Sequence, residues 1–526
     1  MSSSTKRCLI LLEKCKNMNH LKQAHAQIFT TGLENNTFAL SRVLAFCSSH
    51  KHHYGSLIYA CRVFQRIQNP TVCIYNTIIK AFLVNDNFKS ALHVFVKMLQ
   101  NGLRPDNYTI PYVLKVCVGL QDLSLGEMIH GYGSKLGLVF DIFVGNSLMM
   151  MYCVFGDVVA ARYVFDEIPC LSAVSWSVMI SGYAKVGDVD SARLFFDEAP
   201  EKDKGIWGAM ISGYVQNSCF KESLYLFRLM QLTDIVADES IFVSVLSACA
   251  HLGALDVGVW VHRHCNRSKL VPLSVRLSTS LLDMYAKCGD LESAKRLFNS
   301  MQERDIVCWN AMISGLAMHG DGKGAIKLFY DMEKFGMKPD DITFIAVFTA
   351  CSYSGMAHEG LKLLDRMLSV YNIEPKSEHY GCLVDLLSRA GLFEEAMVII
   401  RKITNSMNGS EETLAWRAFL SACCNHGETQ LAELAAEKVL HLDKHIHSGV
   451  YVLLSNLYAT SGKHSDARRV RDMMKIKGAN KTPGCSSVEI DGAVSEFIAG
   501  EKTHPLMEEI HTVLEKMHMQ LDYNNQ

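Results

Sequence analysis

The sequence predicts an all-α fold, an α-solenoid of stacked helical hairpins, because three residue series recur in phase along it. Four of the five tryptophans lie 31, 102 and 107 residues apart, namely Trp176, Trp207, Trp309 and Trp416. A Met-Ile-Ser motif follows three of them at a constant offset and begins at Met179, Met210 and Met312. The motif Gly-Asp-x-x-x-Ala-(Arg/Lys) begins at Gly156, Gly187 and Gly289. A fixed period of this length is typical of solenoids, and the longer intervals are each a sum of three such periods.

Each repeat contains two apolar-periodic stretches of about three helical turns, separated by a turn that contains glycine. WNAMISGLAMHG and GAIKLFYDMEKFG are one such pair. The second stretch closes with Gly and then Pro-Asp in GLRPD (102–106) and in GMKPD (336–340), where Gly stops a helix and Pro prevents its continuation. A hairpin this small cannot bury its own apolar face, so neighbouring hairpins are expected to stack.

Composition excludes several classes of protein. Of the 526 residues, 49% are hydrophobic and 20% are charged, which is enough material for a large folded core. The net charge of −2 gives no electrostatic footprint for nucleic acid, so any nucleic-acid binding has to come from specific positions. No apolar run approaches the ~18 residues that a membrane span needs. The 18 cysteines, without a secretory signal, indicate reduced thiols rather than a disulfide framework.

The N-terminal stretch MSSSTKRCLILLEKCKNMNHLKQ is basic, and Glu13 is its one acidic residue. This composition is similar to that of an organellar transit peptide. The same stretch also has the character of a first amphipathic helix, and the sequence leaves both interpretations open.

The repeats resemble those of the plant pentatricopeptide repeat family, in the PLS class with alternating repeat lengths. The resemblance implies that the fold is an all-α, right-handed α-solenoid superhelix of stacked helical hairpins. VCIYNTIIKAFLVNDNFKSALHVFVKMLQNGLRPD (72–106) resembles a P repeat, and the stretch after it resembles an L repeat. Residues 1–71 resemble degenerate L and S repeats. The array covers 72–412, and its repeats are expected at 72–106, 107–141, 142–172, 173–203, 204–238, 239–274, 275–305, 306–340, 341–376 and 377–412.

The C-terminal region resembles the E subgroup of this class. TLAWRAFLSACCNHGETQLAELAAEKVLHLD and SGVYVLLSNLYATSGKHSDARRVRDMMKIKG look like the E1 and E2 motifs, which we place at 413–481. TPGCSSVEI and FIAGEKTHPLMEEI resemble the start of a segment that leads into a deaminase domain. Residues 482–526 are therefore expected to be a short extension that ends before any complete deaminase domain.

The resemblance implies that each repeat faces one base of a single-stranded RNA, read by the fifth and the last residue of the repeat. Asn suits a pyrimidine, Ser or Thr leaves room for a purine, and the last residue biases the choice within each class. The resemblance therefore implies U for Asn76/Asp106, C for Asn146/Ser172, G for Ser177/Asp203, G for Thr279/Asp305 and U for Asn310/Asp340. Val174 and Val307 match the apolar second place that packs against base faces.

Other repeats depart from this pattern. The L repeats carry Pro111, Val243 and Ile345 at the fifth place, and two further repeats carry Gly208 and Gly381 there, so these repeats are expected to read no base. If the last repeat faces the base four before the target, as the resemblance implies, the site is 5′-U-n-C-G-n-n-G-U-n-n-n-n-n-C with the final C as the target. A structural alternative exists at every pair, because Asn and Asp are also common helix N-caps.

The sequence predicts no catalytic residues, no metal site and no cofactor. A zinc deaminase needs His-x-Glu and a separate Cys-x-x-Cys, and the chain has no Cys-x-x-Cys. His426-Gly427-Glu428 has the right letters but is expected in a helical turn. We expect the cluster around Cys47 and His50 to be a polar insertion rather than a metal site. Four cysteines recur in phase with the repeats and are expected in helices: Cys117, Cys249, Cys351 and Cys423. The group at His262, His264 and Cys265 is also expected in a helix.

Together these expectations describe a non-catalytic RNA-binding factor that selects sites for C-to-U editing. Its partners would be single-stranded organellar RNA and, through 413–526, a deaminase-bearing pentatricopeptide repeat protein or other editing cofactors, with no membrane and no small-molecule substrate. The expected location is an organelle, the mitochondrion in preference to the chloroplast. Two alternatives remain: an RNA stability or splicing factor that acts by occupancy, and a helical-repeat scaffold that binds peptides.

Overall fold

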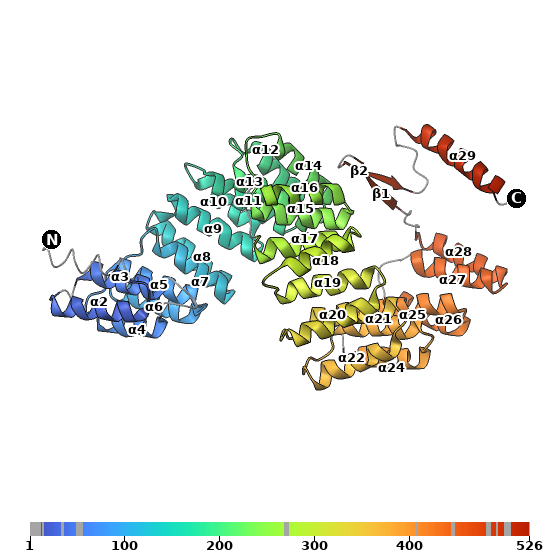
Figure 1. Cartoon of the computed structure of the whole chain (residues 1–526). Helices are drawn as coiled ribbons and strands as arrows, with labels where there is room; N and C mark the ends of the chain where they lie inside the picture. Colours follow the sequence, from blue (N-terminus) through green and yellow to red (C-terminus); the bar gives the residue numbers. More distant parts are fainter. Residues whose placement is uncertain are drawn as a thin grey trace. The chain divides into compact units, whose positions relative to one another are not determined.

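The structure is a computed structural model that describes residues 12, 15–32, 36–48, 56–267, 273–406, 409–442, 448–479, 485–490, 493–498 and 506–524. The chain divides into two compact units, 1–241 and 242–526, and each is built from helices that follow one another as antiparallel hairpins (Figure 1). Among the described helices, none is long and apolar enough to cross a membrane.

The first compact unit is a run of short helices. Within it the first helices of successive hairpins contact one another directly, as α5, α7, α9, α11 and α13 do. Its helices are α2 (Met18–Thr30), α3 (Thr37–Ser48), α4 (Leu57–Arg66), α5 (Val72–Val84), α6 (Phe88–Gln100), α7 (Thr109–Leu120), α8 (Leu123–Lys135), the 3₁₀ helix η1 (Leu138–Phe140), α9 (Ile142–Phe155), α10 (Val158–Glu167), α11 (Ala173–Lys185), α12 (Val189–Glu198), α13 (Lys204–Gln216) and α14 (Phe220–Gln231).

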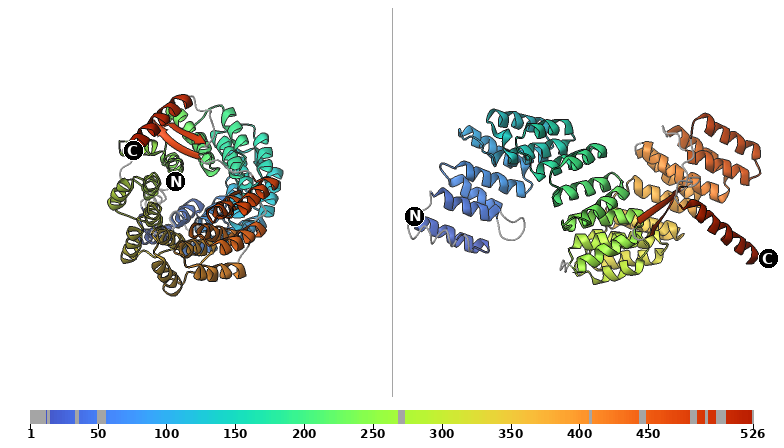
Figure 2. Two further views of the ribbon diagram at one scale, coloured as in Figure 1. Left: turned by 90° about the vertical axis from the view of Figure 1, so that its right-hand side faces the viewer. Right: turned by 90° about the horizontal axis from the view of Figure 1, so that it is seen from above.

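The second compact unit continues the same hairpin pattern, and the views of Figure 2 show its helices from two further directions. Here α17, α19, α21, α23, α25 and α27 form the row of first helices in mutual contact. Its helices are α15 (Glu239–Leu252), α16 (Leu255–Arg267), α17 (Val275–Lys287), α18 (Leu291–Ser300), α19 (Ile306–Met318), α20 (Gly322–Lys334), α21 (Asp341–Tyr353), α22 (Ala357–Ser369), α23 (Ser377–Arg389), α24 (Phe393–Ser406), α25 (Gly409–His426), α26 (Thr429–Leu442), α27 (Ser448–Thr460), α28 (His464–Ile476) and α29 (Met507–Asn524).

The Gly-Asp-x-x-x-Ala motif makes the turn inside a hairpin. Gly289 has a φ of +90°, a left-handed conformation that favours glycine and ends α17. Asp290 then caps α18 by accepting a hydrogen bond of 3.0 Å from the backbone N–H of Ser293. Ala294 is fully buried at the hairpin contact. The motifs that begin at Gly156 and Gly187 have the same arrangement.

The Trp and Met-Ile-Ser-Gly series form the contacts between hairpins. Trp309 packs edge-on against Phe298 of the preceding second helix, with ring centroids 5.0 Å apart. Gly315, which follows the Met-Ile-Ser of α19, lies so close to α17 that a Cβ there would be 2.6 Å from the Cβ of Ala286. The recurring motif is therefore a contact surface between neighbouring first helices, and only a residue without a side chain allows this approach.

The expected α-solenoid of stacked hairpins is confirmed within each compact unit, with one departure from an all-α chain. Near the C-terminus β1 (Cys485–Ile490) pairs antiparallel with β2 (Ala493–Ile498), and Cys485 lies opposite Ile498. The carboxylate of Glu489 in β1 accepts backbone N–H groups of Asp256 (2.9 Å) and Val257 (3.3 Å) in the first turn of α16. The hairpin is thus tied to a helix more than 200 residues earlier in the chain.

The described cysteines are free thiols. The four in-phase cysteines are fully buried in first helices, as expected. Burial raises the pKa of Cys117, Cys351 and Cys423 to about 12, and it also raises the pKa of Cys249. Such thiols stay protonated and unreactive at neutral pH.

At the N-terminus the amphipathic helix α2 begins at Met18, after the cap Asn17.

Candidate nucleic-acid interface

The last residue of each predicted base-reading pair lies at the start of the next first helix. Ser172, Asp203, Asp305 and Asp340 are the N-caps of α11, α13, α19 and α21. Asp106 accepts the backbone N–H groups of Tyr108 (3.1 Å) and Thr109 (2.8 Å) before α7. The structural alternative raised from the sequence is therefore correct for these last residues, and any base reading by them is an additional role. It is wrong for Asn76, Asn146 and Asn310, which lie inside α5, α9 and α19 and cap no helix.

Asn76 and Asp106 come together across the whole length of one repeat. The Nδ2 group of Asn76 donates to Oδ1 of Asp106 over 3.0 Å. A third residue completes the group, because the hydroxyl of Thr109 lies 2.8 Å from both Oδ1 of Asn76 and Oδ1 of Asp106. The amide of Asn76 thus has a donor facing a carboxylate and an acceptor facing a hydroxyl.

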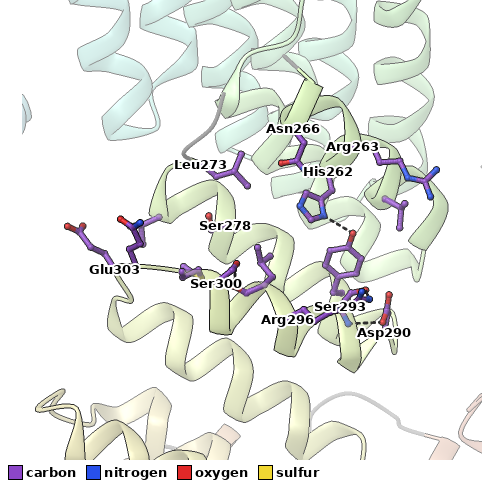
Figure 3. Close-up of a pocket in the computed structure, with 16 residues that line it drawn as sticks. His262, Arg263, Asn266, Leu273, Ser278, Asp290, Ser293, Arg296, Ser300 and Glu303 are labelled. Carbon is purple, nitrogen blue, oxygen red and sulfur yellow. Dashed lines mark hydrogen bonds between the residues drawn. The ribbon is translucent and has the colours of Figure 1, made fainter. Parts of the chain in front are cut away.

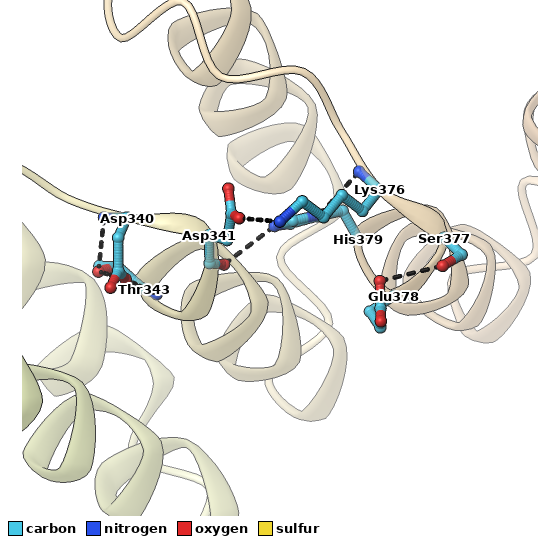
Figure 4. A network of polar contacts seen from close by, with 7 residues as sticks. All are labelled: Asp340, Asp341, Thr343, Lys376, Ser377, Glu378 and His379. Carbon is cyan, nitrogen blue, oxygen red and sulfur yellow. Dashed lines mark hydrogen bonds and ion pairs between the residues drawn. The ribbon is translucent and has the colours of Figure 1, made fainter. Parts of the chain in front are cut away.

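Asn310 and Asp340 repeat this arrangement in the second compact unit. Nδ2 of Asn310 donates to Oδ1 of Asp340 over 3.0 Å, and the Thr343 hydroxyl donates to Oδ1 of Asn310 over 2.6 Å. Figure 4 shows Thr343 against Asp340, where its hydroxyl also accepts the backbone N–H of Asp340 and completes a capping box.

Asn146 and Ser172 are connected through a third residue. The hydroxyl of Ser175 donates to Oδ1 of Asn146 over 2.7 Å and lies 3.2 Å from the hydroxyl of Ser172. The chain of groups is therefore amide, hydroxyl, hydroxyl, with no carboxylate in it. This is a chemical difference from the two pairs that end in Asp.

The remaining two pairs lack a direct contact in the part of the chain that the structure describes. The hydroxyl of Ser177 donates to the backbone carbonyl of Ala173 over 2.9 Å. The hydroxyl of Thr279 donates to the carbonyl of Val275 and lies 2.8 Å from Sγ of Cys308, whose backbone N–H is capped by Asp305. Both hydroxyls are bonded to their own helix backbone.

The fifth residues are less accessible than the sequence suggests. Asn76, Asn310 and Thr279 are 7%, 5% and 8% exposed. The two Asn side chains contact an Asp and a Thr, and Thr279 contacts Cys308. The apolar residues expected to contact base faces are open, since Val174 and Val307 are 55% and 54% exposed. The valine side chains are therefore much more accessible to a ligand than the amides of Asn76 and Asn310.

The carboxyl of Asp106 is held in its charged form. Burial alone would raise its pKa, but hydrogen bonds from Thr109, Asn76 and the backbone of Tyr108 outweigh this and lower the pKa below its usual value. Every one of these bonds ends on Oδ1. None of these hydrogen bonds ends on the other oxygen, Oδ2.

The L repeat 341–376 closes differently. Its fifth residue is Ile345, and its last residue, Lys376, forms an ion pair with Asp341 (Figure 4). The buried ring of His379 accepts the backbone N–H of Lys376 at Nδ1 and donates from Nε2 to the carbonyl of Asp341, at 3.0 and 2.9 Å. All of these polar groups bind one another, so this junction offers no base-reading pair.

The other clusters considered from the sequence serve structural roles. His426 ends α25 and its Nε2 lies 3.0 Å from the carbonyl of Arg389, so His426-Gly427-Glu428 is a helix end. His50 lies outside the described residues. Cys265 is fully buried, and His262 binds the hydroxyl of Tyr285 at 2.9 Å. Among the described residues, no group of three His, Cys, Asp or Glu side chains could hold a metal ion.

A cavity of about 1020 Å³ lies between α16, α17 and α18 (Figure 3). His262 lines it and faces Tyr285, and Asp290 caps α18 at its edge. Arg296 also lines it and binds the hydroxyl of Ser293 at 2.9 Å. These lining groups already bind neighbouring protein atoms, and they form no pairing of a nucleophile with a base.

Sequence reasoning missed the third residue of the following repeat. Thr109, Ser175 and Thr343 are fully buried, and each binds the fifth-place Asn of the repeat before it. The signal was readable, because a hydroxyl at the third place occurs only after a repeat whose fifth residue is Asn.

Comparison with family models finds the same repeated element. The PPR repeat family matches residues 70–119 and 304–353, and the PPR repeat matches 146–171, 174–203, 205–233, 277–306, 342–370 and 378–406. The E motif matches residues 426–489, which include all of β1 except its last residue.

Curated relatives cover nearly the whole chain. Pentatricopeptide repeat-containing protein At1g31920 of Arabidopsis thaliana is 38% identical over 98% of this chain and 79% of its own length. Two further Arabidopsis proteins are 36% identical: At1g08070, chloroplastic, over 98% of this chain and 82% of its own length, and At2g22410, mitochondrial, over 96% and 88%. The crystal structure of PPR10 from maize matches 88% of this chain and 77% of its own, with a TM-score of 0.44 and 16% identity.

Proposed function

Since this chain belongs to the pentatricopeptide repeat family, with an E motif that fits the E subgroup, we propose that it is a sequence-specific, single-stranded RNA-binding factor without catalytic activity of its own. Each repeat with a polar fifth residue contacts one unstacked base. The bases are read in the order of the repeats, so the preferred RNA is 5′-U-n-C-G-n-n-G-U-n-n-n-n-n-C.

The observation that carries this proposal is the pairing of fifth and last residues at 3.0 Å in two separate repeats, Asn76 with Asp106 and Asn310 with Asp340. One N–H and one lone pair of each amide remain for a ligand. Exposed valines such as Val307 stand three residues before the Asn and offer an apolar surface for base faces. Together these groups suit a pyrimidine held between side chains, with its Watson–Crick edge toward the amide.

Binding of this kind depends on base contacts more than on bulk charge. The chain has 52 basic and 54 acidic residues, so it neutralises few phosphates. Its affinity for RNA is therefore expected to fall only modestly with added salt. The test is fluorescence anisotropy of the whole chain with the 14-nucleotide RNA above and with a scrambled RNA of the same composition. Equal affinity for the two RNAs rejects the proposal.

We further propose that the bound RNA is an organellar transcript and that the outcome is C-to-U editing of the final C. The region 413–526, which includes the E motif match, recruits a deaminase-bearing pentatricopeptide repeat protein or another editing cofactor. Relatives named chloroplastic and mitochondrial support an organelle as the location, and they give the mitochondrion no preference. Sequencing organellar RNA from a plant that lacks this protein tests the proposal, because one or very few cytidines should lose conversion.

A factor that acts by occupancy alone would bind the same RNA but leave every cytidine converted in that plant. In that outcome RNA abundance or splicing would change instead. A peptide-binding scaffold would fail already in the anisotropy experiment, since neither RNA would bind.

A further inference from the structure

The amide of every fifth-place Asn in the array is held by a hydroxyl from the third place of the next repeat. The distances from hydroxyl oxygen to amide oxygen are 2.8 Å for Thr109 and Asn76, 2.7 Å for Ser175 and Asn146, and 2.6 Å for Thr343 and Asn310. The three contacts come from three separate repeat junctions. The contact therefore recurs at every junction of the array that follows a fifth-place Asn.

The other junctions of the array have no hydroxyl at this place. Where the preceding repeat carries Ser177, Thr279, an apolar residue or Gly at its fifth place, the third residues are Val144, Ile206, Ile241, Leu277, Cys308, His379 and Ala415. Ile241 fills space against the fifth residue before it: its Cγ1 would lie 3.3 Å from a Cβ at Gly208. The third residue therefore follows the chemistry of the fifth residue before it.

A hydroxyl at this place, together with a carboxylate at the other end, decides which way the amide faces. An amide group can turn over, which exchanges its N–H₂ and its oxygen at little steric cost. In Asn310 such a turn would place Oδ1 against the Asp340 carboxylate, which has no proton to donate, and N–H₂ against the Thr343 hydroxyl. The hydroxyl at one end and the carboxylate at the other thus hold a single orientation of the amide.

The orientation matters because uracil and cytosine present opposite patterns. Uracil offers an acceptor at O4 next to a donor at N3, whereas cytosine offers a donor at N4 next to an acceptor at N3. An amide fixed in one orientation complements one of these orders and opposes the other. In the Asn146 repeat the last residue is Ser172, so no carboxylate faces the amide, and the bound Ser175 hydroxyl can donate or accept; there the orientation can reverse.

We propose that Thr109 and Thr343 are positioning residues: together with the carboxylates of Asp106 and Asp340 they set the direction of the Asn76 and Asn310 amides, and they thereby make those two repeats distinguish U from C. This proposal rests on the proposed RNA-binding function. The positioning residues themselves are fully buried and touch no base. Their effect reaches the RNA only through the Asn that they hold.

The test measures the affinity of the whole chain for two RNAs that differ by U or C at the nucleotide six before the target, which faces Asn310. Thr343→Val keeps the shape of the side chain and removes the hydroxyl. The ratio of affinities for U and C is expected to fall about threefold to tenfold, the worth of one hydrogen bond. Thr343→Ser restores the hydroxyl and the ratio.

If Thr343 only stabilised the fold, Thr343→Val would have a different effect. Loss of the capping box lowers the thermal midpoint and weakens binding to both RNAs alike, so the U-to-C ratio stays at the wild-type value. Ile206→Val is the matched control, since Ile206 occupies the same place after Ser177 and has no hydroxyl. It is expected to leave every base preference unchanged.

The outcomes separate the two proposals. A wild-type chain without preference for the matched RNA contradicts the proposed function itself. A wild-type chain that distinguishes U from C, with Thr343→Val distinguishing them equally well, overturns this inference alone. If Thr343→Val fails to fold, Thr109→Val replaces it. The ratio of affinities is then measured with RNAs that carry U or C at the nucleotide thirteen before the target, which faces Asn76 in the first compact unit.

Discussion

Asn310 and Asp340 stand at the fifth and the last place of one repeat, 30 residues apart in sequence, and Nδ2 of Asn310 donates to Oδ1 of Asp340 over 3.0 Å. Asn76 and Asp106 have the same separation and the same distance. A helical hairpin brings the end of its loop back beside the start of its first helix, so the pairing follows from the fold. The chemistry of the pair is then free to vary from repeat to repeat.

Replacing Asn310 with Ala removes the group that we propose to read the U six before the target. Affinity for the matched RNA is expected to fall about tenfold, within the 1–3 kcal/mol that a good base contact is worth. Because the amide also binds Asp340 and Thr343, the thermal midpoint should fall slightly as well. Asn217→Ala is the control: its Nδ2 binds only the backbone carbonyls of Ala184 and Gly213, so stability changes without a change in base preference.

Replacing Gly315 with Ala tests the contact between first helices. The new Cβ would lie 2.6 Å from the Cβ of Ala286, which cannot swing aside, so α19 and α17 must separate. We expect a loss of about 1–3 kcal/mol in the free energy of unfolding, measured by chemical denaturation. Gly131→Ala on α8 meets no atom within 4 Å and should be neutral or stabilising by up to about 1 kcal/mol. Equal effects of the two changes would contradict the close-packing account.

The His262 and Tyr285 pair predicts a dependence on pH. Burial lowers the pKa of His262, so the folded state favours the neutral ring. Its contribution to stability is present above the ordinary histidine pKa of about 6.5 and is lost as pH falls through the lowered folded value. In the repeats that begin at 341 and 377, the equivalent places carry Leu364 and Leu387.

The double change His262→Leu with Tyr285→Leu is therefore expected to fold, and its thermal midpoint should fall less than that of the wild type between pH 7 and pH 5. His262→Leu alone leaves the Tyr285 hydroxyl buried without its partner and should cost about 1–3 kcal/mol. A double variant as pH-sensitive as the wild type would show that this pair does not carry the effect.

The contact of Glu489 with α16 predicts that charge holds the C-terminal β-hairpin in place. Glu489→Gln keeps the shape and removes the charge that faces the helix N-terminus, a contribution of about 0.3–1 kcal/mol. Hydrogen exchange of the Asp256 and Val257 amides should become faster in this variant. Glu508→Gln on α29 removes an acidic charge elsewhere and should leave these two amides unchanged.

Much of the fold could be predicted from the sequence because its determinants are local. A glycine such as Gly289 and the aspartate after it act within one turn, and their spacing gives the period of the array. The β-hairpin was missed although the sequence carries a hairpin signal, Asp491-Gly492 between two alternating stretches.

The candidate site was predictable only in part. The fifth and last residues follow from a repeat pattern, but their burial and the partners of Asn76 and Asn310 do not. The hydroxyl partners, Thr109 and Thr343, come from the next repeat, 33 residues further on; the sequence shows that they accompany a fifth-place Asn, but their contact with it follows only from the stacking of the hairpins. An Asp or Ser at the last place of a repeat suits both an N-cap and the proposed contact with a base. The sequence alone therefore could not show which of the two roles the residue has.

The most direct test of base reading changes the preference of one repeat. Asp340→Ser gives the Asn310 repeat the same pair as Asn146 with Ser172, and a serine there still caps the next helix, as Ser172 does. The affinity of the whole chain is measured for RNAs with U or C six nucleotides before the target. The account predicts that the preference changes from U to C at this nucleotide and at no other. An unchanged preference for U, or equal affinity for both RNAs in the wild type, would contradict it.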